Sequence, residues 1–351
     1  MHPRPSRLGF GTSGLMGSAL TSTGRLRLLE AAFDQGITHF DTAPLYGAGL
    51  AEEVLGRFCK GRRHNVTITT KFGLLPRTIP VPLRPLLPIA RLARRGLRRF
   101  KPSAVAGVGY GGPLRLEDVE HFGEAGASQD PNSLRAGTAA GATPPASSMD
   151  LPATAAVLRQ HLHISLRKLK SDYVDFYLLH DCGAGDVTDT AVAALEDLVR
   201  EGKIRRWGVA TGRWGSRQIL ESRTGFQGVV QIPDHLLRRD TSWFVDHAPP
   251  PLFSHSALRQ GVADPSPAGL LLERLLERWA LHTGRSAADP SLLGEVLLLG
   301  GLHNNPQGCV IFSSSRAERI RANAGTLRRW GPEIPALAVM LNLEILASTE
   351  G

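Results

Sequence analysis

Four residues whose side chains can do acid–base chemistry together stand at or soon after the ends of short apolar runs: Asp41, Tyr46, Lys71 and His180. A tyrosine has an ordinary pKa of about 10, so it donates a proton poorly at neutral pH unless a cation stabilises its phenolate. Lys71 can be that cation, and Asp41 can keep the ammonium charged and oriented. His180 can donate to, or position, a substrate oxygen. Taken singly, such residues more often pack or cap a strand end, so their significance depends on their meeting.

Short apolar runs alternating with helical patterns are the elements that would bring these residues together. Eight runs have the length and composition of buried strands and cover residues 8–11, 37–40, 66–70, 173–179, 206–210, 229–232, 252–254 and 309–312. Apolar residues at helical spacing predict helices between them, one from about residue 22 to Gly36 and others over 51–58, 154–169, 191–201, 216–222, 270–281 and 317–324.

This alternation predicts an α/β fold with a parallel sheet, which is either open and doubly wound or closed into a barrel. Eight strands favour closure. In a closed barrel the carboxyl ends of the strands meet at one mouth, where the polar residues that follow three of the runs would converge. We therefore expect a (β/α)8 TIM barrel that occupies residues 1–351 as a single domain.

The segment Gly9-Phe10-Gly11-Thr12-Ser13-Gly14 matches the dinucleotide-binding pattern Gly-x-Gly-x-x-Gly, and a Rossmann fold has to be weighed. In that fold a helix opens at the third glycine, whereas here the helical pattern begins several residues later. Asp34 also falls inside the predicted helix, not at the end of a second strand. We interpret the segment as a glycine-rich first loop.

Residues 74–149 interrupt the alternation after the third strand, first with prolines and arginines and then with Gly, Ala, Ser and Pro. Residues 72–116 hold nine Arg or Lys and no acidic residue, so the net charge of +9 belongs to this segment, and the remainder balances at 32 basic against 32 acidic residues. We expect a long, partly disordered insertion with one short basic helix near residues 89–100. A solvated insertion is the simplest explanation. A lid, or a contact between residues 77–115 and an anionic partner or membrane surface, is the functional alternative.

Composition bounds the class of protein. A chain of 351 residues with 42% hydrophobic and 21% charged residues is neither collagen-like, wholly disordered nor a disulfide scaffold. Cys59, Cys182 and Cys309 lie far apart, so neither disulfides nor a metal site is expected, and a reducing cytoplasm fits best. No apolar run is long enough for an integral membrane segment, and the balanced charge outside the insertion argues against a nucleic-acid partner.

The motifs around the four chemical residues resemble the aldo-keto reductase family. Phe-Asp-Thr-Ala-Pro-Leu-Tyr-Gly at 40–47, with Ala-Glu-Glu-Val-Leu-Gly at 51–56, is similar to the family's first signature, and residues 70–73, 165–180 and 201–209 resemble later ones. Most of the chain takes part, apart from the insertion and residues 282–307. The resemblance implies an NAD(P)-dependent oxidoreductase on an (α/β)8 barrel, with Asp41, Tyr46, Lys71 and His180 as its catalytic residues and no metal.

The resemblance also implies where a nicotinamide cofactor would bind. Thr12 and Ser13 stand where members of the family contact the nicotinamide ribose, and Gln231 stands where they bind the carboxamide. After the fifth strand, Ala210-Thr211 replaces the family's usual Ser-Asn pair, so only Thr211 is expected to contact the carboxamide. His255 stands where an aromatic ring often stacks on the nicotinamide. The complete expected set is Thr12, Ser13, Asp41, Thr211, Gln231, His255, Ser256, Leu258, Ser313, Ser314, Arg319 and Asn323.

Near the C-terminus, Val-Ile-Phe-Ser-Ser-Ser at 310–315 resembles the family's adenosine-phosphate site. Arg319 would grip a 2′-phosphate bidentately, and Asn323 would contact the adenine. Ser313 replaces a frequent lysine, which removes one cation. We expect NADPH as the cofactor, with NADH as the alternative.

The function that follows is reduction of an aldehyde or ketone by hydride transfer, or the reverse oxidation, with Tyr46 as the general acid. Leu-Leu-His-Asp at 178–181 is also similar to the branch of the family that oxidises sugars, so an aldose-type dehydrogenase is the alternative enzyme. A nucleotide-binding barrel that serves as a regulatory or docking module is the alternative outside enzymes.

Overall fold

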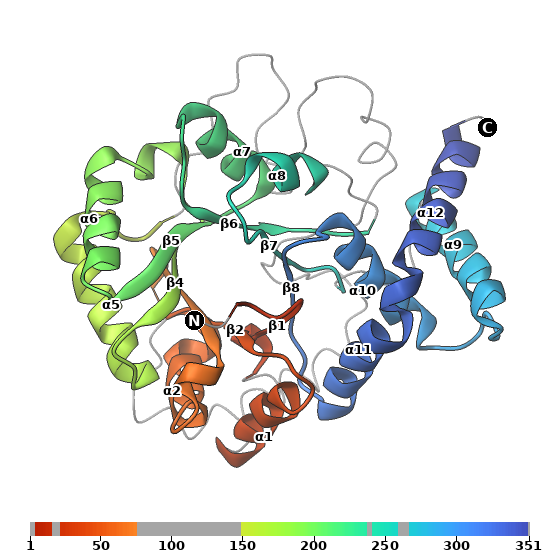
Figure 1. The fold of residues 1–351 in the computed structure, drawn as a ribbon, viewed down its shortest axis with the longest axis horizontal. Coiled ribbons are helices and arrows are strands. Elements are labelled where there is room, and N and C mark those ends of the chain that lie inside the picture. The colour runs from red at the N-terminus through yellow and green to blue at the C-terminus, as the bar shows by residue number, and fades with distance from the viewer. Residues whose placement is uncertain (1–3, 16–21, 76–148, 237–240, 259–266, 350–351) are drawn as a thin grey trace, which may run out of the picture.

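The computed structural model describes residues 4–15, 22–75, 149–236, 241–258 and 267–349. Eight parallel strands within them form a closed barrel in chain order, and the last strand pairs with the first through Leu8 and Val310. Figure 1 shows the ring of strands with helices around it. The strands are β1 (Leu8–Gly11), β2 (His39–Asp41), β3 (Thr67–Phe72), β4 (Val174–His180), β5 (Ile204–Ala210), β6 (Val229–Pro233), β7 (Phe253–His255) and β8 (Cys309–Phe312).

All eight expected strands are therefore confirmed, with ends that differ by at most two residues. The difference matters at the site: Asp41 and His180 are the last residues of β2 and β4, and Lys71 lies inside β3. These residues belong to the strands themselves and not to the loops that follow. Each is paired with a residue of the neighbouring strand: Asp41 with Thr69, Lys71 with Leu178 and His180 with Ala210.

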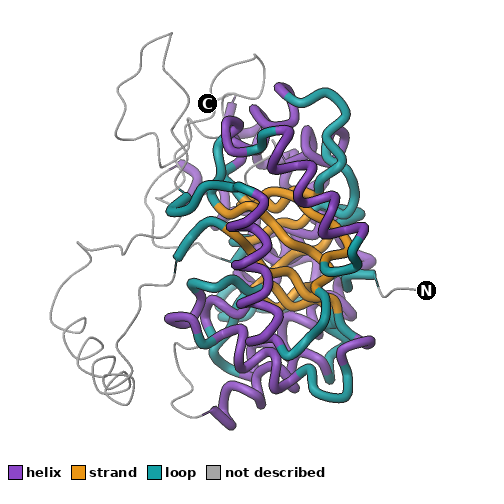
Figure 2. The backbone as a smooth tube through the Cα atoms, turned by 90° about the vertical axis from the view of Figure 1, so that its left-hand side faces the viewer, coloured by secondary structure: helices purple, strands orange, loops and turns teal. Residues whose placement is uncertain are grey.

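Helices cover the outside of the barrel, as Figure 2 shows from the side. Seven of them match the expected helices: α1 (Ser22–Phe33), α2 (Ala51–Phe58), α5 (Ala155–Leu169), α6 (Asp189–Arg200), α7 (Arg213–Ser222), α9 (Pro267–Thr283) and α11 (Ala317–Trp330). Local chemistry sets some ends, since the Thr188 hydroxyl caps α6 by accepting a hydrogen bond from Ala191 N at 3.1 Å.

Three described helices were not predicted from the sequence: α8 (Thr241–His247), α10 (Leu292–Asn304) and α12 (Ile334–Thr349). α10 is buried on several sides and is almost wholly apolar, so it lacks the one-sided periodicity that marks a surface helix. α12 packs with α9 beside the barrel (Figure 1). Among the described helices, none has both the length and the apolar composition needed to cross a bilayer.

The long insertion falls in the connection between β3 and α5. Residues 76–148 lie outside the described part of the chain, together with the basic helix and the disorder expected there. The two ends of the connection are described and meet: Asp150 N donates to Gly73 O at 2.7 Å, and Leu75 N donates to an Asp150 carboxylate oxygen at 2.7 Å.

The glycines of the first segment serve packing. A Cβ atom on Gly9 would come within 2.9 Å of the Cys309 sulfur, and one on Gly11 within 2.6 Å of Ser313 Oγ. The closed barrel excludes the Rossmann alternative, and the following helix begins only at Ser22.

The barrel interior holds a small apolar core beneath the mouth, formed by Phe176, Leu178, Ala210, Val229, Phe253, Cys309 and Ile311. His39 of β2 is fully buried among these side chains, with its ring stacked 4.8 Å from that of Phe253. Its Nδ1 lies 2.9 Å from the Thr67 hydroxyl. A second, larger core lies between the strands and the surrounding helices.

Candidate active site

Lys71 is the centre of the polar cluster at the carboxyl ends of the strands. Its ammonium donates to Asp41 Oδ1 at 2.6 Å, to the Thr42 carbonyl at 3.1 Å and to the Tyr46 hydroxyl at 3.2 Å. The register of β2 and β3 pairs Asp41 with Thr69, which places Lys71 two residues further along and on the same face of the strand. Lys71 is 2% exposed and Asp41 3%, so the ion pair is shielded from water.

Tyr46 reaches this cluster because the chain turns sharply after β2. The Tyr46 amide donates to the Ala43 carbonyl at 3.0 Å, and a short 3-10 turn, η2 (Tyr46–Gly49), follows. The Lys71 ammonium also lies 4.8 Å from the centre of the Tyr46 ring. Asp41, Tyr46 and Lys71 were predicted to meet at one mouth of the barrel, and the structure brings them together.

His180, the last residue of β4, is the fourth member of the cluster and lies beside Tyr46. The two rings meet edge to face, with centres 6.1 Å apart. Burial, reinforced by the charges of Lys71 and His255, holds the pKa of His180 well below its usual value. The imidazole is therefore neutral near pH 7. Its buried Nδ1 has no hydrogen-bond partner among the described residues.

The ionisation of Tyr46 differs from the sequence expectation. Burial raises the pKa of the Tyr46 phenol, and this effect outweighs the lowering by the charge and hydrogen bond of Lys71; Asp41 and Asp181 raise it further. Burial also opposes the charge on Lys71, but Asp41 and Tyr46 together raise the pKa of Lys71 above its ordinary value. Lys71 therefore lowers the pKa of the Tyr46 phenol only in part, and the pKa stays above the ordinary value of a tyrosine. At neutral pH the phenol is protonated and the amine is charged.

A cavity of about 600 Å³ opens above this cluster. Most of the expected nicotinamide-side residues line it together with the four chemical residues. The lining residues from the expected set are Ser13, Asp41, Tyr46, Lys71, His180, Thr211, Gln231, His255, Ser256, Leu258 and Ser313.

Among the residues expected on the nicotinamide side, Thr12 is the one that does not line this cavity. Its side chain is fully buried, and its hydroxyl donates to the Thr42 hydroxyl at 2.9 Å. Thr42 supplies the carbonyl that accepts from Lys71, so Thr12 supports the loop behind the lysine instead of presenting a hydroxyl to a ligand.

Gln231 offers a free acceptor to a bound molecule. Its amide nitrogen donates to Asp41 Oδ1 at 3.2 Å, whereas its carbonyl oxygen is buried and has no hydrogen-bond partner among the described residues. A buried amide oxygen without a donor is costly, so it favours a ligand that carries an N–H group. The carboxamide of a nicotinamide has this chemistry, and the donor set of the site fits it.

A second cavity of about 1070 Å³ adjoins the first, and both are lined by Leu258 and Ser313. Three more expected residues line it: Ser314, Arg319 and Asn323. The structure adds Arg329 and Trp330, the last residues of α11, which the sequence analysis missed. The Arg-Arg-Trp run at 328–330 was the only available signal for them, and a cation beside an aromatic residue at a helix end is common on surfaces.

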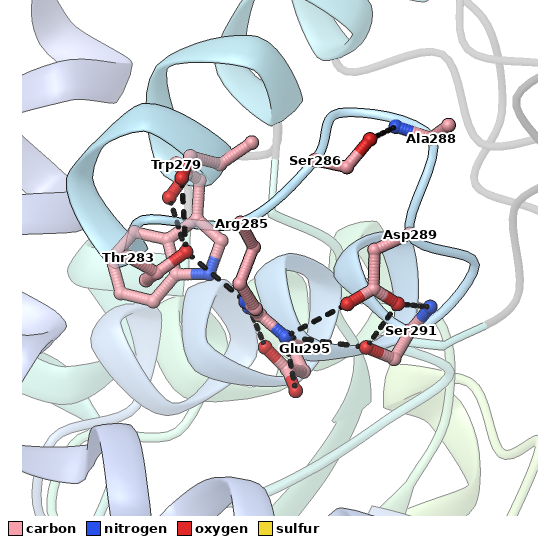
Figure 3. A network of polar contacts seen from close by, with 9 residues as sticks. Trp279, Thr283, Arg285, Ser286, Ala288, Asp289, Ser291 and Glu295 are labelled. Atoms are coloured by element: carbon pink, nitrogen blue, oxygen red, sulfur yellow. Dashed lines mark hydrogen bonds and ion pairs between the residues drawn. The ribbon is translucent and has the colours of Figure 1, made fainter.

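The wall of the second cavity is held by a network around Arg285 (Figure 3). The Arg285 guanidinium donates to Ser291 Oγ at 3.3 Å and to both carboxylate oxygens of Glu295, at 3.2 Å and 2.5 Å. It also lies 5.5 Å from the centre of the Trp330 ring. Because Ser291, Glu295 and Trp330 line the cavity, this arginine fixes its shape.

Comparison with known proteins gives the same picture of the fold. A 22% identical aldo-keto reductase from Bacillus halodurans, in its holo form, superposes with a TM-score of 0.59 over 96% of this chain and 92% of that one. An aldo-keto reductase from Klebsiella pneumoniae in complex with NADPH, also 22% identical, gives 0.58 over 96% and 91%.

Among curated proteins, the uncharacterized oxidoreductase YqkF of Bacillus subtilis is 23% identical over 265 residues, or 76% of this chain and 63% of that protein. The methylglyoxal reductase YeaE of Escherichia coli is 33% identical over 153 residues, or 42% and 52%. The matched regions thus span less than two thirds of these relatives. The family model described as "Aldo/keto reductase family" matches residues 7–102 and 143–245, more than half of the sequence. A match of that extent, on a closed eight-stranded barrel, means that the chain belongs to the aldo/keto reductase family.

Proposed function

We propose that this protein is an NADPH-dependent oxidoreductase that reduces an aldehyde or ketone to an alcohol, with Tyr46 as the proton donor. The observation that carries the proposal is the Lys71 ammonium, which bridges the Asp41 carboxylate and the Tyr46 hydroxyl at the floor of a cavity. The bound cofactor supplies the hydride, and the protein residues manage the proton.

The protonation states support reduction as the direction at neutral pH. Hydride addition to a carbonyl leaves an alkoxide, which needs a protonated donor within hydrogen-bond reach. Burial keeps Tyr46 protonated, and the neighbouring Lys71 stabilises the phenolate that forms when the proton leaves. Neutral His180 donates a hydrogen bond to the substrate oxygen and orients it. Asp41 holds the lysine in its charged form.

For the cofactor, Gln231 would receive the carboxamide, and Ser13, Thr211, His255 and Ser256 would surround the nicotinamide and its ribose. Leu258 and Ser313, which border both cavities, would lie along the pyrophosphate. In the second cavity Arg319 would pair with a 2′-phosphate, while Ser314 and Asn323 would contact the adenosine. The arginine favours NADPH over NADH.

The alternative is an aldose-type dehydrogenase. One curated relative, a D-threo-aldose 1-dehydrogenase from Pseudomonas sp, is 42% identical over 76 residues, or 21% of this chain. Oxidation of a sugar hydroxyl needs Tyr46 as a phenolate base, and its raised pKa opposes this form at neutral pH. A docking module without turnover is disfavoured because Lys71 contacts both Asp41 and Tyr46, Tyr46 meets His180, and all four residues line one cavity.

The experiment replaces Tyr46 with Phe. We expect NADPH consumption with small aldehydes to fall by about 100-fold or more, because the proton donor is lost, while NADPH affinity stays within about twofold. Tyr173→Phe is the matched control, since Tyr173 directly precedes β4, at the end of the strand opposite His180, and does not line the cavity. Turnover that survives Tyr46→Phe, or tight NADPH binding with no turnover of any carbonyl or sugar, would contradict the proposal.

We also propose that the protein acts in the cytoplasm as one domain. The three cysteines are unpaired and buried, which a reducing compartment maintains. The proposed contact between the basic residues 77–115 and an anionic partner is supported by sequence charge alone, because this segment lies outside the described residues.

A further inference from the structure

Behind the active site, a buried carboxylate connects the two segments that carry Tyr46 and Lys71. Glu52, in the first turn of α2, is fully buried. Its Oε1 accepts a hydrogen bond at 2.8 Å from the hydroxyl of Thr70, which is also fully buried. Thr70 immediately precedes Lys71 in β3. Because side chains alternate along a strand, Thr70 faces the helices outside the barrel while Lys71 faces the mouth.

The second oxygen of Glu52 is linked to the turn that carries Tyr46. Glu52 Oε2 lies 3.7 Å from the Lys168 ammonium, on α5. Lys168 in turn donates at 3.3 Å to the carbonyl of Gly49, the last residue of η2, which begins at Tyr46. Thus one oxygen of the carboxylate accepts a hydrogen bond from Thr70, next to Lys71, and the other forms an ion pair, without a hydrogen bond, with Lys168.

The packing of α2 against α5 makes this link possible. A Cβ atom on Gly56 would lie 2.4 Å from the Lys168 carbonyl and 2.7 Å from that of Leu169, so only a glycine allows the two helices to approach this closely. The close approach brings the Lys168 side chain within reach of both Glu52 and Gly49.

Burying a carboxylate is unfavourable unless hydrogen bonds and a partner charge compensate for the lost hydration. An apolar residue would fill this position between α2, β3 and α5 at lower cost if packing were its sole role. The charge at this position is explained if it holds the segments that carry Tyr46 and Lys71 in one geometry. Catalysis is sensitive to such geometry, since a displacement of about 1 Å can cost about 100-fold in rate.

We propose that Glu52 is a positioning residue that holds the Tyr46 hydroxyl and the Lys71 ammonium at hydrogen-bonding distance, acting through Thr70 on one side and Lys168 on the other. This inference rests on the proposed role of Tyr46 as proton donor. Glu52 does not touch the cavity; it acts on the 3.2 Å contact between Tyr46 and Lys71 from behind.

Thr70→Val tests the first link, and Thr70→Ser is its conservative counterpart, which keeps the donor. We expect Thr70→Val to lower kcat for a small aldehyde about tenfold with NADPH affinity unchanged. The high-pH limb of kcat/KM should also move to higher pH, because a looser Lys71 lowers the pKa of Tyr46 less. Thr70→Ser should restore both properties. A merely structural role would lower the unfolding midpoint and leave this pH limb in place.

Lys168→Met tests the second link at a side chain that is itself partly exposed. Because the change removes the partner charge of the buried Glu52 carboxylate, the unfolding midpoint is measured together with kcat. We expect a smaller loss in kcat and a shift of the pH limb in the same direction. Lys170→Met, which changes the exposed lysine that ends α5, is the matched control and should behave like the parent protein.

An unshifted pH limb and parental kcat in both Thr70→Val and Lys168→Met would overturn the inference. If Thr70→Val does not fold, Lys168→Met alone decides in the same way. Tyr46→Phe, measured in parallel, separates the two proposals: full turnover in that variant refutes the proton donor itself, whereas its inactivity beside unaffected Thr70 and Lys168 variants refutes only the positioning role.

Discussion

His39 should make the barrel sensitive to acid. Its pKa is lowered from 6.5 to about 3, mainly by burial in the barrel interior and further by the charge of Lys71. The folded protein therefore keeps His39 neutral down to about pH 3, whereas the unfolded chain protonates it below about pH 6.5. Between these values the unfolded state binds more protons than the folded state, so the free energy of unfolding falls as the pH falls.

The size of the effect follows from the two pKa values. At pH 5 the unfolded histidine is about 1.5 pH units below its pKa, and each unit corresponds to about 1.36 kcal/mol. Lowering the pH from 7 to 5 should then remove about 2 kcal/mol through His39 alone. This is a large share of the roughly 5–15 kcal/mol that stabilises an ordinary domain.

The assay is urea unfolding of the parent protein and His39→Gln at pH 7 and pH 5. Glutamine keeps a polar group beside the Thr67 hydroxyl and does not titrate. The parent should lose about 2 kcal/mol more than the variant between the two pH values. His180, whose pKa is also lowered, is present in both proteins and cancels. Equal losses would refute the reasoning, since His39 would then be protonated in the folded barrel.

Two further changes test the packing and the second cavity. Gly56→Ala should destabilise the protein by about 1–3 kcal/mol because its methyl group would strike the Lys168 carbonyl, whereas Gly294→Ala in α10, with open space around it, should stabilise it by about 0.5 kcal/mol. Thermal unfolding measures both, and destabilisation of equal size would refute the steric argument. Arg319→Leu should weaken NADPH binding about tenfold or more and leave NADH binding within about twofold; fluorescence titration measures both affinities, and equal weakening would remove the 2′-phosphate from the proposal.

The strand pattern of this chain was readable because parallel barrel strands are short, continuous apolar runs bounded by polar residues. Residues 8–11 and 309–312 match β1 and β8 at both ends. The meeting of Asp41, Lys71 and His180 followed from barrel geometry, which directs the carboxyl ends of strands to one place. α10 was missed for the converse reason: buried on several sides, it has no polar face to reveal a helical period.

Other features depend on three-dimensional environment that residue types do not encode. The sequence paired Tyr46 with a lysine, but only the structure shows that the surrounding protein removes water from the phenol, and this loss of hydration is the largest cause of its raised pKa. Thr12 carries a hydroxyl suited to a ligand, yet this hydroxyl donates its hydrogen bond to the buried Thr42. The contacts of Glu52 could not be predicted because Thr70 and Lys168 lie 18 and 116 residues away along the chain.

The joined ends of the connection after β3 bear on how this barrel tolerates change. Gly73 and Asp150 are held together by a main-chain hydrogen bond, and the Asp150 carboxylate secures Leu75 as well. The two described ends of the connection between β3 and α5 are therefore joined directly to each other. For a flexible loop, doubling the length costs only about 0.6 kcal/mol in closure entropy. A change in the length of the connection at this junction would therefore leave Lys71, two residues before Gly73, in register with β4.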